Sequence, residues 1–352
     1  MRAVVYRGIG DVRVEDLPVP ECGDGELLVR IAACGVCWTD LKKVDHGTVP
    51  PPRVFGHEMA GVVERVGAGV ERFTAGARVQ VYHHIPCRAC PLCARRLYAQ
   101  CPGYKQTGVG AGYEPSGGGF AEYVRVAPWI VSGGGVTPVP DSATLEAASL
   151  LEPINTCLKC VRIAAPRQGD AVLVVGAGAI GQILVRLLVL EGARVAVSEP
   201  LPDRRERALE GGAELAVDPF AADASAAVTA WAGRAGCDTA IVAVPGQAPL
   251  DTAVSATCPG GRIVLFAHTK LDDPVTLDAG QICYLEKDVV GAYSADADLN
   301  EEVAELVFSG RLRTDDLITD RFDLADAARA FDLARSPSDG SLKVLLTTGF
   351  DA

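Results

Sequence analysis

The sequence has few of the features that mark membrane, secreted or nucleic-acid-binding proteins. No apolar run reaches about 18 residues, and the longest candidate is broken by Gln182 and Arg186, which argues against a membrane span. Acidic residues (45) outnumber basic residues (33), and the formal net charge of −12 argues against a nucleic-acid partner, which requires a basic face. The N-terminus begins directly with a strand pattern and has no apolar signal-peptide region, so we expect a cytoplasmic protein.

Internal repeats and low-complexity linkers are also missing, so the domains are inferred from the pattern of predicted strands and helices. A chain of 352 residues exceeds the usual size of a single core, which predicts two domains. Up to about residue 150, short strands alternate with Gly, Pro and Asp turns, as in a β-barrel or sandwich. Strands and helices then alternate, which predicts a parallel doubly wound sheet. The main predicted strands are 1–6, 12–17, 26–33, 78–83, 194–198, 215–218, 239–244, 262–266 and 342–347, and predicted helices include 221–231 and 299–309.

A glycine-rich turn follows the apolar strand predicted at 172–175. Gly176, Gly178 and Gly181 form a G-x-G-x-x-G pattern ahead of an apolar helical stretch. In a dinucleotide-binding fold these glycines permit a tight turn, close approach of a pyrophosphate and close helix–strand packing. The helix N-terminus offers free N–H groups to the phosphates. We therefore predict a nucleotide site, the alternative being an ordinary glycine turn.

An acidic residue stands where the ribose of NAD is bound in such folds. Glu199 ends the next predicted strand, 18 residues after Gly181. Its carboxylate would repel the 2′-phosphate of NADP and so favours NAD. Arg204 and Arg205 follow and are able to attract that phosphate, although solvated charges at a helix start are the simpler interpretation. Further candidate cofactor-binding residues are Ala179, Ile180 and Val244.

Four of the twelve cysteines are clustered. Cys87, Cys90, Cys93 and Cys101 form two C-x-x-C steps with a fourth cysteine eight residues later. Four thiolates at such spacing match a closed tetrahedral structural zinc site. An iron–sulfur cluster or unmetallated thiols are the alternatives. We expect zinc here to hold a loop and to take no part in chemistry.

A second group of metal-ligand types is dispersed along the first half of the chain. Cys37, the pair His57 and Glu58, and Glu152 all precede the glycine turn. Each one alone is weak evidence, because a single histidine is more often a satisfied polar residue and Glu-Pro is a common helix start. Their joint presence ahead of a nucleotide-binding motif indicates a catalytic metal site.

The chain resembles the zinc-dependent medium-chain dehydrogenases, the family of alcohol, sorbitol and threonine dehydrogenases. The matching segments are 34–40, 56–58, the four-cysteine cluster, 118–123, 152–153, the glycine turn, 290–293 and 342–344. The resemblance implies an α/β protein in which a GroES-like, β-rich catalytic domain spans 1–152 and 290–352. It implies a structural zinc lobe at about 84–104 and a Rossmann NAD-binding domain at 153–289.

The resemblance also implies two zinc ions per chain, one structural and one catalytic. Cys37, His57 and Glu152 would hold the catalytic zinc, with Glu58 as the alternate ligand. Glu152 stands where alcohol dehydrogenases have a second cysteine, which is closer to the polyol and threonine branches.

Three further assignments follow from the resemblance or concern residues close in sequence to the implied ligands. Cys157 or Cys160 is an alternative third protein ligand. Thr39 matches the hydroxyl that takes the substrate proton. Lys42 occupies the position that often carries a relay histidine.

The implied enzyme transfers hydride between NAD and a secondary alcohol, most simply a polyol, sugar or (amino)cyclitol. Threonine-type or simple alcohol dehydrogenases are the alternatives within the class. A non-catalytic nucleotide-binding protein, such as the lens crystallins of this superfamily, is the alternative outside it. The intact ligand set favours an enzyme. The family commonly forms homodimers or homotetramers, with 262–266 and the residues after it as the expected contact.

Overall fold

The computed structural model describes residues 1–83, 85–104, 117–267, 274–337 and 340–350. The chain forms two compact units: unit 1 comprises Met1–Asn155 and Ala295–Ala352, and unit 2 comprises Thr156–Ser294. The sequence prediction had placed these boundaries after residues 152 and 289. Helix α6 (Leu151–Ala164) runs through the first boundary, so the sequence shows no break there.

Unit 1 is built on two β-sheets. The larger has the strand order β15 (Ile318–Asp323), β16 (Lys343–Thr347), β3 (Leu27–Gly35), β5 (Glu58–Val66), β6 (Arg78–Val81) and β8 (Val136–Pro138), with β7 (Tyr123–Val126) also paired to β3. The smaller has the order β2 (Asp11–Asp16), β1 (Arg2–Gly8) and β4 (Arg53–Val54). Neighbouring strands are antiparallel except β15 and β16. The predicted β-rich domain is therefore present.

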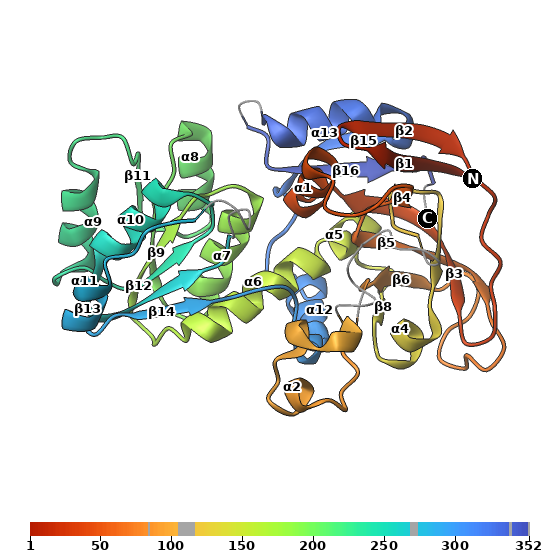
Figure 1. Cartoon of the computed structure of the whole chain (residues 1–352), viewed down its shortest axis with the longest axis horizontal. Coiled ribbons are helices and arrows are strands. Elements are labelled where there is room, and N and C mark those ends of the chain that lie inside the picture. The colour runs from red at the N-terminus through yellow and green to blue at the C-terminus, as the bar shows by residue number, and fades with distance from the viewer. Residues whose placement is uncertain (84, 105–116, 268–273, 338–339, 351–352) are drawn as a thin grey trace. The chain divides into compact units, whose positions relative to one another are not determined.

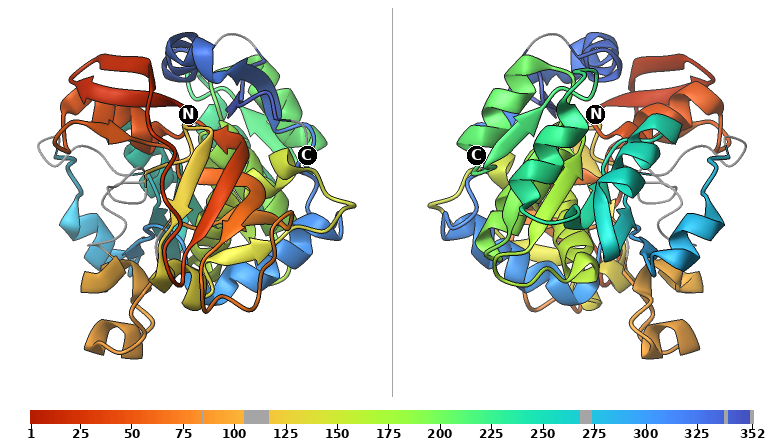
Figure 2. Two further views of the ribbon diagram at one scale, coloured as in Figure 1. Left: turned by 90° about the vertical axis from the view of Figure 1, so that its right-hand side faces the viewer. Right: turned by 90° about the vertical axis from the view of Figure 1, so that its left-hand side faces the viewer.

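Helices cover the sheets of unit 1, and a small lobe extends from it. The helices are α1 (Trp38–His46), α4 (Pro128–Ser132), α5 (Leu145–Ser149), α12 (Asn300–Phe308) and α13 (Ala327–Arg335). One buried apolar cluster joins β1, β3, β5 and β7 to α13. The lobe carries α2 (Pro91–Ala94) and the 3₁₀ turn η1 (Tyr98–Gln100), and it projects away from the sheets (orange in Figure 2).

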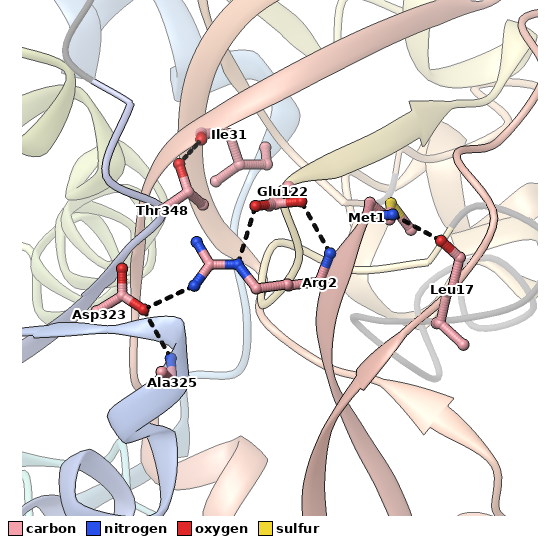
Figure 3. Close-up of polar contacts among 8 residues, drawn as sticks. All are labelled: Met1, Arg2, Leu17, Ile31, Glu122, Asp323, Ala325 and Thr348. Carbon is pink, nitrogen blue, oxygen red and sulfur yellow. Dashed lines mark hydrogen bonds and ion pairs between the residues drawn. The ribbon is translucent and has the colours of Figure 1, made fainter.

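The two chain segments of unit 1 are joined by polar contacts at the N-terminal strand (Figure 3). The backbone and Nε of Arg2 donate to the carboxylate of Glu122 at 2.8 and 3.1 Å, and its Nη1 donates to Asp323 at 3.2 Å. The Met1 ammonium donates to the carbonyl of Leu17 at 2.7 Å. These contacts, with strand β16 beside β3, explain why the C-terminal segment belongs to unit 1.

Unit 2 is a six-stranded parallel sheet with helices on both faces (Figure 1). Its strand order is β11 (Leu215–Val217), β10 (Arg194–Ser198), β9 (Ala171–Val175), β12 (Cys237–Val242), β13 (Thr257–Leu265) and β14 (Asp288–Gly291). This is the 3-2-1-4-5-6 order of dinucleotide-binding folds. The helices between the strands are α7 (Ala179–Leu190), α8 (Pro202–Glu210), α9 (Ala224–Ala232), α10 (Gln247–Ala256) and α11 (Ala279–Tyr284). The predicted doubly wound sheet is confirmed.

One strand differs from the prediction in a way that bears on assembly. The strand predicted at 262–266 begins at Thr257, because Pro259 and the glycines after it, which resemble a turn, continue the strand. It is paired on both sides, with β12 and β14. The edge strands of the sheet are β11 and β14, so β13 lies inside it. Among the described residues, no helix is long and apolar enough to cross a bilayer.

Candidate active site

Three of the predicted metal ligands meet in unit 1. Cys37 is the N-cap residue of α1, and His57 and Glu58 stand at the start of β5. One ligand atom from each lies within 4.8 Å of the others. His57 and Glu58 are buried, and Cys37 is half-buried. Sulfur, nitrogen and oxygen donors at this spacing fit a zinc ion, which takes all three donor types.

Asp40 orients the histidine of this group. It is fully buried in the first turn of α1, and its Oδ1 lies 3.2 Å from Nδ1 of His57. Its Oδ2 accepts from the backbone N–H of Cys37 at 3.4 Å. A partner on Nδ1 leaves Nε2 of His57 for a metal. Burial by itself lowers the pKa of His57, but the negative charges of Asp40 and Cys37 outweigh it and raise that pKa well above its usual value.

The position of the Glu58 carboxylate depends on Lys343 and Gly35. The ammonium of Lys343, from the start of β16, forms a buried ion pair with Oε2 of Glu58 and donates to the carbonyl of Val36 at 3.1 Å. A Cβ on Gly35 would collide with that Oε2 and lie 2.8 Å from Cε of Lys343. The absence of a side chain at residue 35 therefore makes room for this pair.

Glu152 does not belong to the group whose ligand atoms are all within 4.8 Å, but it interacts electrostatically with His57 and Glu58. It is buried in the first turn of α6. Burial raises its pKa to about 7; His57 lowers that pKa and Glu58 raises it further, so the charges of both residues reach this carboxyl. The alternative ligands Cys157 and Cys160 are fully buried on the same helix, in unit 2, and neither belongs to a metal-ligand group among the described residues.

The predicted proton acceptors lie on α1. Thr39 is exposed in the first turn of the helix, and Lys42 is half-buried. Residues three apart on a helix are neighbours on its surface, so the two lie on one face. Trp38, next to Cys37, is half exposed.

The four-cysteine cluster forms a second group of metal-ligand type. The sulfur of Cys93 lies 3.5 Å from that of Cys90 and 4.0 Å from that of Cys87. With Zn–S bonds of about 2.3 Å, sulfurs at the corners of a tetrahedron are about 3.8 Å apart. Burial raises the pKa of Cys101, but hydrogen bonds from the backbone of Cys87 and Tyr104 outweigh it and lower that pKa to about 6. The arrangement fits a tetrathiolate zinc site.

In unit 2 the glycine turn lies between β9 and α7. Gly176 has φ of +96°, a region that favours glycine, and a Cβ there would lie 2.6 Å from Cγ1 of Val244. A Cβ on Gly181 would collide with the carbonyl oxygen of Gly176. Gly178 is the N-cap residue of α7, and Ala179 and Ile180 form the first turn, which is half-buried. The close packing that the motif requires is present.

Glu199 is held beside this turn. Its Oε2 accepts from the backbone N–H of Ala177 at 2.7 Å, and its Oε1 accepts from that of Leu201 at 3.0 Å. A Cβ on Gly178 would lie 3.5 Å from Nη1 of Arg204, so that guanidinium is also next to the turn. Unit 2 therefore places a carboxylate and a cation at the predicted nucleotide site.

Comparison with known proteins identifies the class. Residues 23–140 match the family of the alcohol dehydrogenase GroES-like domain, and residues 179–309 match the zinc-binding dehydrogenase family. The chain belongs to the zinc-binding alcohol dehydrogenase family and is an NAD- and zinc-dependent oxidoreductase.

Similar proteins differ in substrate. The chain is 31% identical over 350 residues to L-threonine 3-dehydrogenase of Pyrococcus horikoshii, covering 96% of each chain. It is 26% identical over 352 residues to sorbitol dehydrogenase of Bacillus subtilis, covering 98% of this chain and 97% of the relative. A solved zinc-binding dehydrogenase of Sinorhizobium meliloti, bound to NADP, is similar with a TM-score of 0.88, 29% identity and 98% coverage of each chain.

Sequence reasoning missed the residues that support the ligands. Asp40 was visible only as part of the segment 34–40, and nothing near Glu58 in the sequence indicated Lys343. Lys343 was visible only inside the matching segment 342–344 and as a lysine that interrupts the apolar strand predicted at 342–347. Gly35 was visible only as a glycine inside the matching segment.

Proposed function

We propose that the chain oxidises a secondary hydroxyl of a polyol, sugar or (amino)cyclitol to a ketone with NAD, or catalyses the reverse. The observation that carries this proposal is the grouping of Cys37, His57 and Glu58 within 4.8 Å, with Glu152 beside them. One thiolate combined with carboxylates makes a less electron-rich zinc site than two thiolates, which suits polyhydroxy ligands. The likeness to sorbitol dehydrogenase supports this substrate class. The likeness to threonine dehydrogenase supports an amino-alcohol as the second candidate.

Each residue then has a role. Cys37, His57 and a carboxylate from Glu152 or Glu58 would hold the zinc. When bound, zinc would supply Lewis acidity toward the substrate hydroxyl, and NAD would supply the hydride acceptor. Thr39 accepts the hydroxyl proton and gives up its own, and Lys42, on the same helix face, takes that proton in its neutral form and passes it to solvent.

The cofactor preference rests on Glu199. Its buried carboxylate beside the glycine turn would repel a 2′-phosphate, which supports NAD over NADP. The guanidinium of Arg205 donates to the carbonyls of Glu199 and Pro200 at 2.7 Å, which engages it with the backbone. Arg204 lies next to the turn, and the Sinorhizobium relative was solved with NADP, so both cofactors belong in the assay.

The proposal extends to the state of the molecule in the cell: a cytoplasmic homodimer or homotetramer that binds no nucleic acid. Of the two edge strands of unit 2, β11 and β14, the second lies beside the predicted contact strand at 262–266, so β14 is the edge that a second copy would extend. Size-exclusion chromatography with light scattering tests the subunit number, and a monomer at working concentration would contradict it.

The test of function is nicotinamide reduction with NAD or NADP against linear polyols, cyclitols, aminocyclitols, threonine and primary alcohols. We expect activity with NAD on a polyol or cyclitol. Cys37→Ala and Glu152→Ala should abolish turnover while NAD still binds, and Cys22→Ala, outside both cysteine groups, is the control. Activity confined to threonine or primary alcohols would overturn the substrate class. Normal turnover by Cys37→Ala would overturn the zinc assignment.

A further inference from the structure

Asn155 is a fully buried amide on the helix that carries Glu152. Its Nδ2 donates to the carbonyl of Asp296 at 3.0 Å and to Oδ1 of Asn300 at 2.8 Å. Its Oδ1 accepts from the backbone N–H of Asp296 at 2.8 Å. The Asn155 amide therefore uses both of its N–H donors and one acceptor site of its oxygen to bond to one short segment, 296–300.

The spacing between Asn155 and Glu152 places them on one face of α6. Residues three apart on a helix are surface neighbours, and both side chains are buried. Asn155 is the fifth residue of α6 and lies about one turn after its start. Its amide therefore fixes the helix within one turn of Glu152.

The segment 296–300 is held in turn by the four-cysteine lobe. Oδ1 of Asp298 accepts from Nη1 of Arg88 at 2.9 Å, and its Oδ2 accepts from the hydroxyl of Tyr98 at 2.8 Å. The backbone N–H of Asp298 donates to Oδ1 of Asp296 at 2.9 Å. A continuous set of hydrogen bonds therefore runs from the lobe to Asn155, one turn from Glu152 on α6.

We propose that Asn155 is a positioning residue for Glu152: it ties the N-terminal end of α6 to the segment 296–300, and through Asp298 to the four-cysteine lobe, and so places the Glu152 carboxylate at the catalytic metal site. This inference rests on the proposed assignment of Glu152 to that site. It gives the lobe a role in addition to local stability, because order in the lobe contributes to the placement of a catalytic ligand.

The test uses Asn155→Leu, which keeps similar volume and removes all three hydrogen bonds. The matched control is Arg2→Met, which removes the contacts to Glu122 and Asp323 elsewhere in unit 1 (Figure 3). The backbone bond of Arg2 remains in that control. Three quantities are measured on the full chain: cobalt affinity of the catalytic site by chelator competition, the visible spectrum of the cobalt protein, and hydrogen exchange without metal of the backbone amides in 151–156, where Pro153 has none.

Partners that orient metal ligands are typically worth about 10–100-fold in metal affinity. We expect Asn155→Leu to weaken cobalt binding at the catalytic site by about this factor, alter the spectrum and speed exchange at 151–156. Arg2→Met should leave all three unchanged. Asp298→Asn should change the cobalt affinity, the spectrum and the exchange in the same direction but to a smaller extent. It weakens the contacts between the lobe and the segment 296–300 and leaves the hydrogen bonds of Asn155 in place.

If Asn155→Leu does not fold, Asn300→Ala replaces it, since this change removes the acceptor of only one Asn155 donor. Unchanged affinity, spectrum and exchange in the folded variant would overturn the proposal. Glu152→Ala separates the two hypotheses. If it leaves the cobalt spectrum unaltered, the ligand assignment fails; if it alters the spectrum and Asn155→Leu does not, only the positioning role fails.

Discussion

Two lysines of this chain are equally buried but have opposite electrostatic surroundings. Lys343 in unit 1 and Lys287 in unit 2 are each 7% exposed. Lys343 is paired with Glu58, whereas Lys287 donates to the carbonyl of Val254 at 2.6 Å and has no ion pair with a carboxylate among the described residues. Burial lowers the pKa of Lys287. Burial also acts to lower the pKa of Lys343, but the charge and hydrogen bond of Glu58, together with the charges of Cys37 and Glu152, outweigh it, and the pKa is raised.

Replacing each lysine by methionine should therefore have very different costs in metal-free protein. Lys343→Met leaves Glu58 as an uncompensated buried charge, which costs about 3–5 kcal/mol. Lys287→Met loses one hydrogen bond of about 1 kcal/mol and removes a charge that burial disfavours. The pKa of Lys343 is raised above its unfolded value of 10.5, so its contribution is complete below that pH and is lost as the pH rises through the folded pKa. Neutral pH is thus suitable for the comparison.

Urea unfolding after chelation, followed by circular dichroism and tryptophan emission, measures both costs. With a slope of about 2–3 kcal/mol per molar urea, Lys343→Met should lower the midpoint by about 1–2 M. For Lys287→Met the same slope gives less than about 0.5 M. Adding Glu58→Gln to Lys343→Met should recover much of the loss, because it removes the unpaired charge. Equal costs for the two lysines, or no recovery in the double variant, would refute the reasoning.

Three other predictions concern the carboxylates and the lobe. Burial raises the pKa of Glu152 from 4.5 to about 7, so the folded chain binds the extra proton between these values, and this group should lower metal-free stability by up to about 3 kcal/mol from pH 5 to 8. By urea unfolding, Glu152→Gln should lose this part of the fall and keep the part above about pH 6.5 that comes from the raised pKa of His57. Cys93→Ser should remove one of two bound zinc ions by elemental analysis and, for a loss of about 2 kcal/mol, lower the Tm by about 4–8 °C; unchanged zinc content would contradict the tetrathiolate site. Glu199→Ala should raise the NADP-to-NAD ratio of kcat/KM by about tenfold, equivalent to about 1.4 kcal/mol, and an unchanged ratio would mean that this carboxylate does not select the cofactor.

The sequence by itself determined the features that depend on short spacing. The four cysteines lie within one lobe, and the glycine turn lies between one strand and the helix that follows it. In both cases the chain brings the residues together locally, and the residue types carry the chemistry. Strand and helix periodicity likewise predicted the β-rich part and the doubly wound sheet.

Tertiary structure decided the contacts between distant segments. Lys343 reaches Glu58 from the last strand of the chain, and Asn155 bonds to Asp296 across 141 positions of sequence. It also decided that Glu58 joins Cys37 and His57 within 4.8 Å, whereas the resemblance had ranked Glu152 first. These contacts form when sheets and helices pack and bring buried charges and amides together. The spacing of residues along the chain does not specify them.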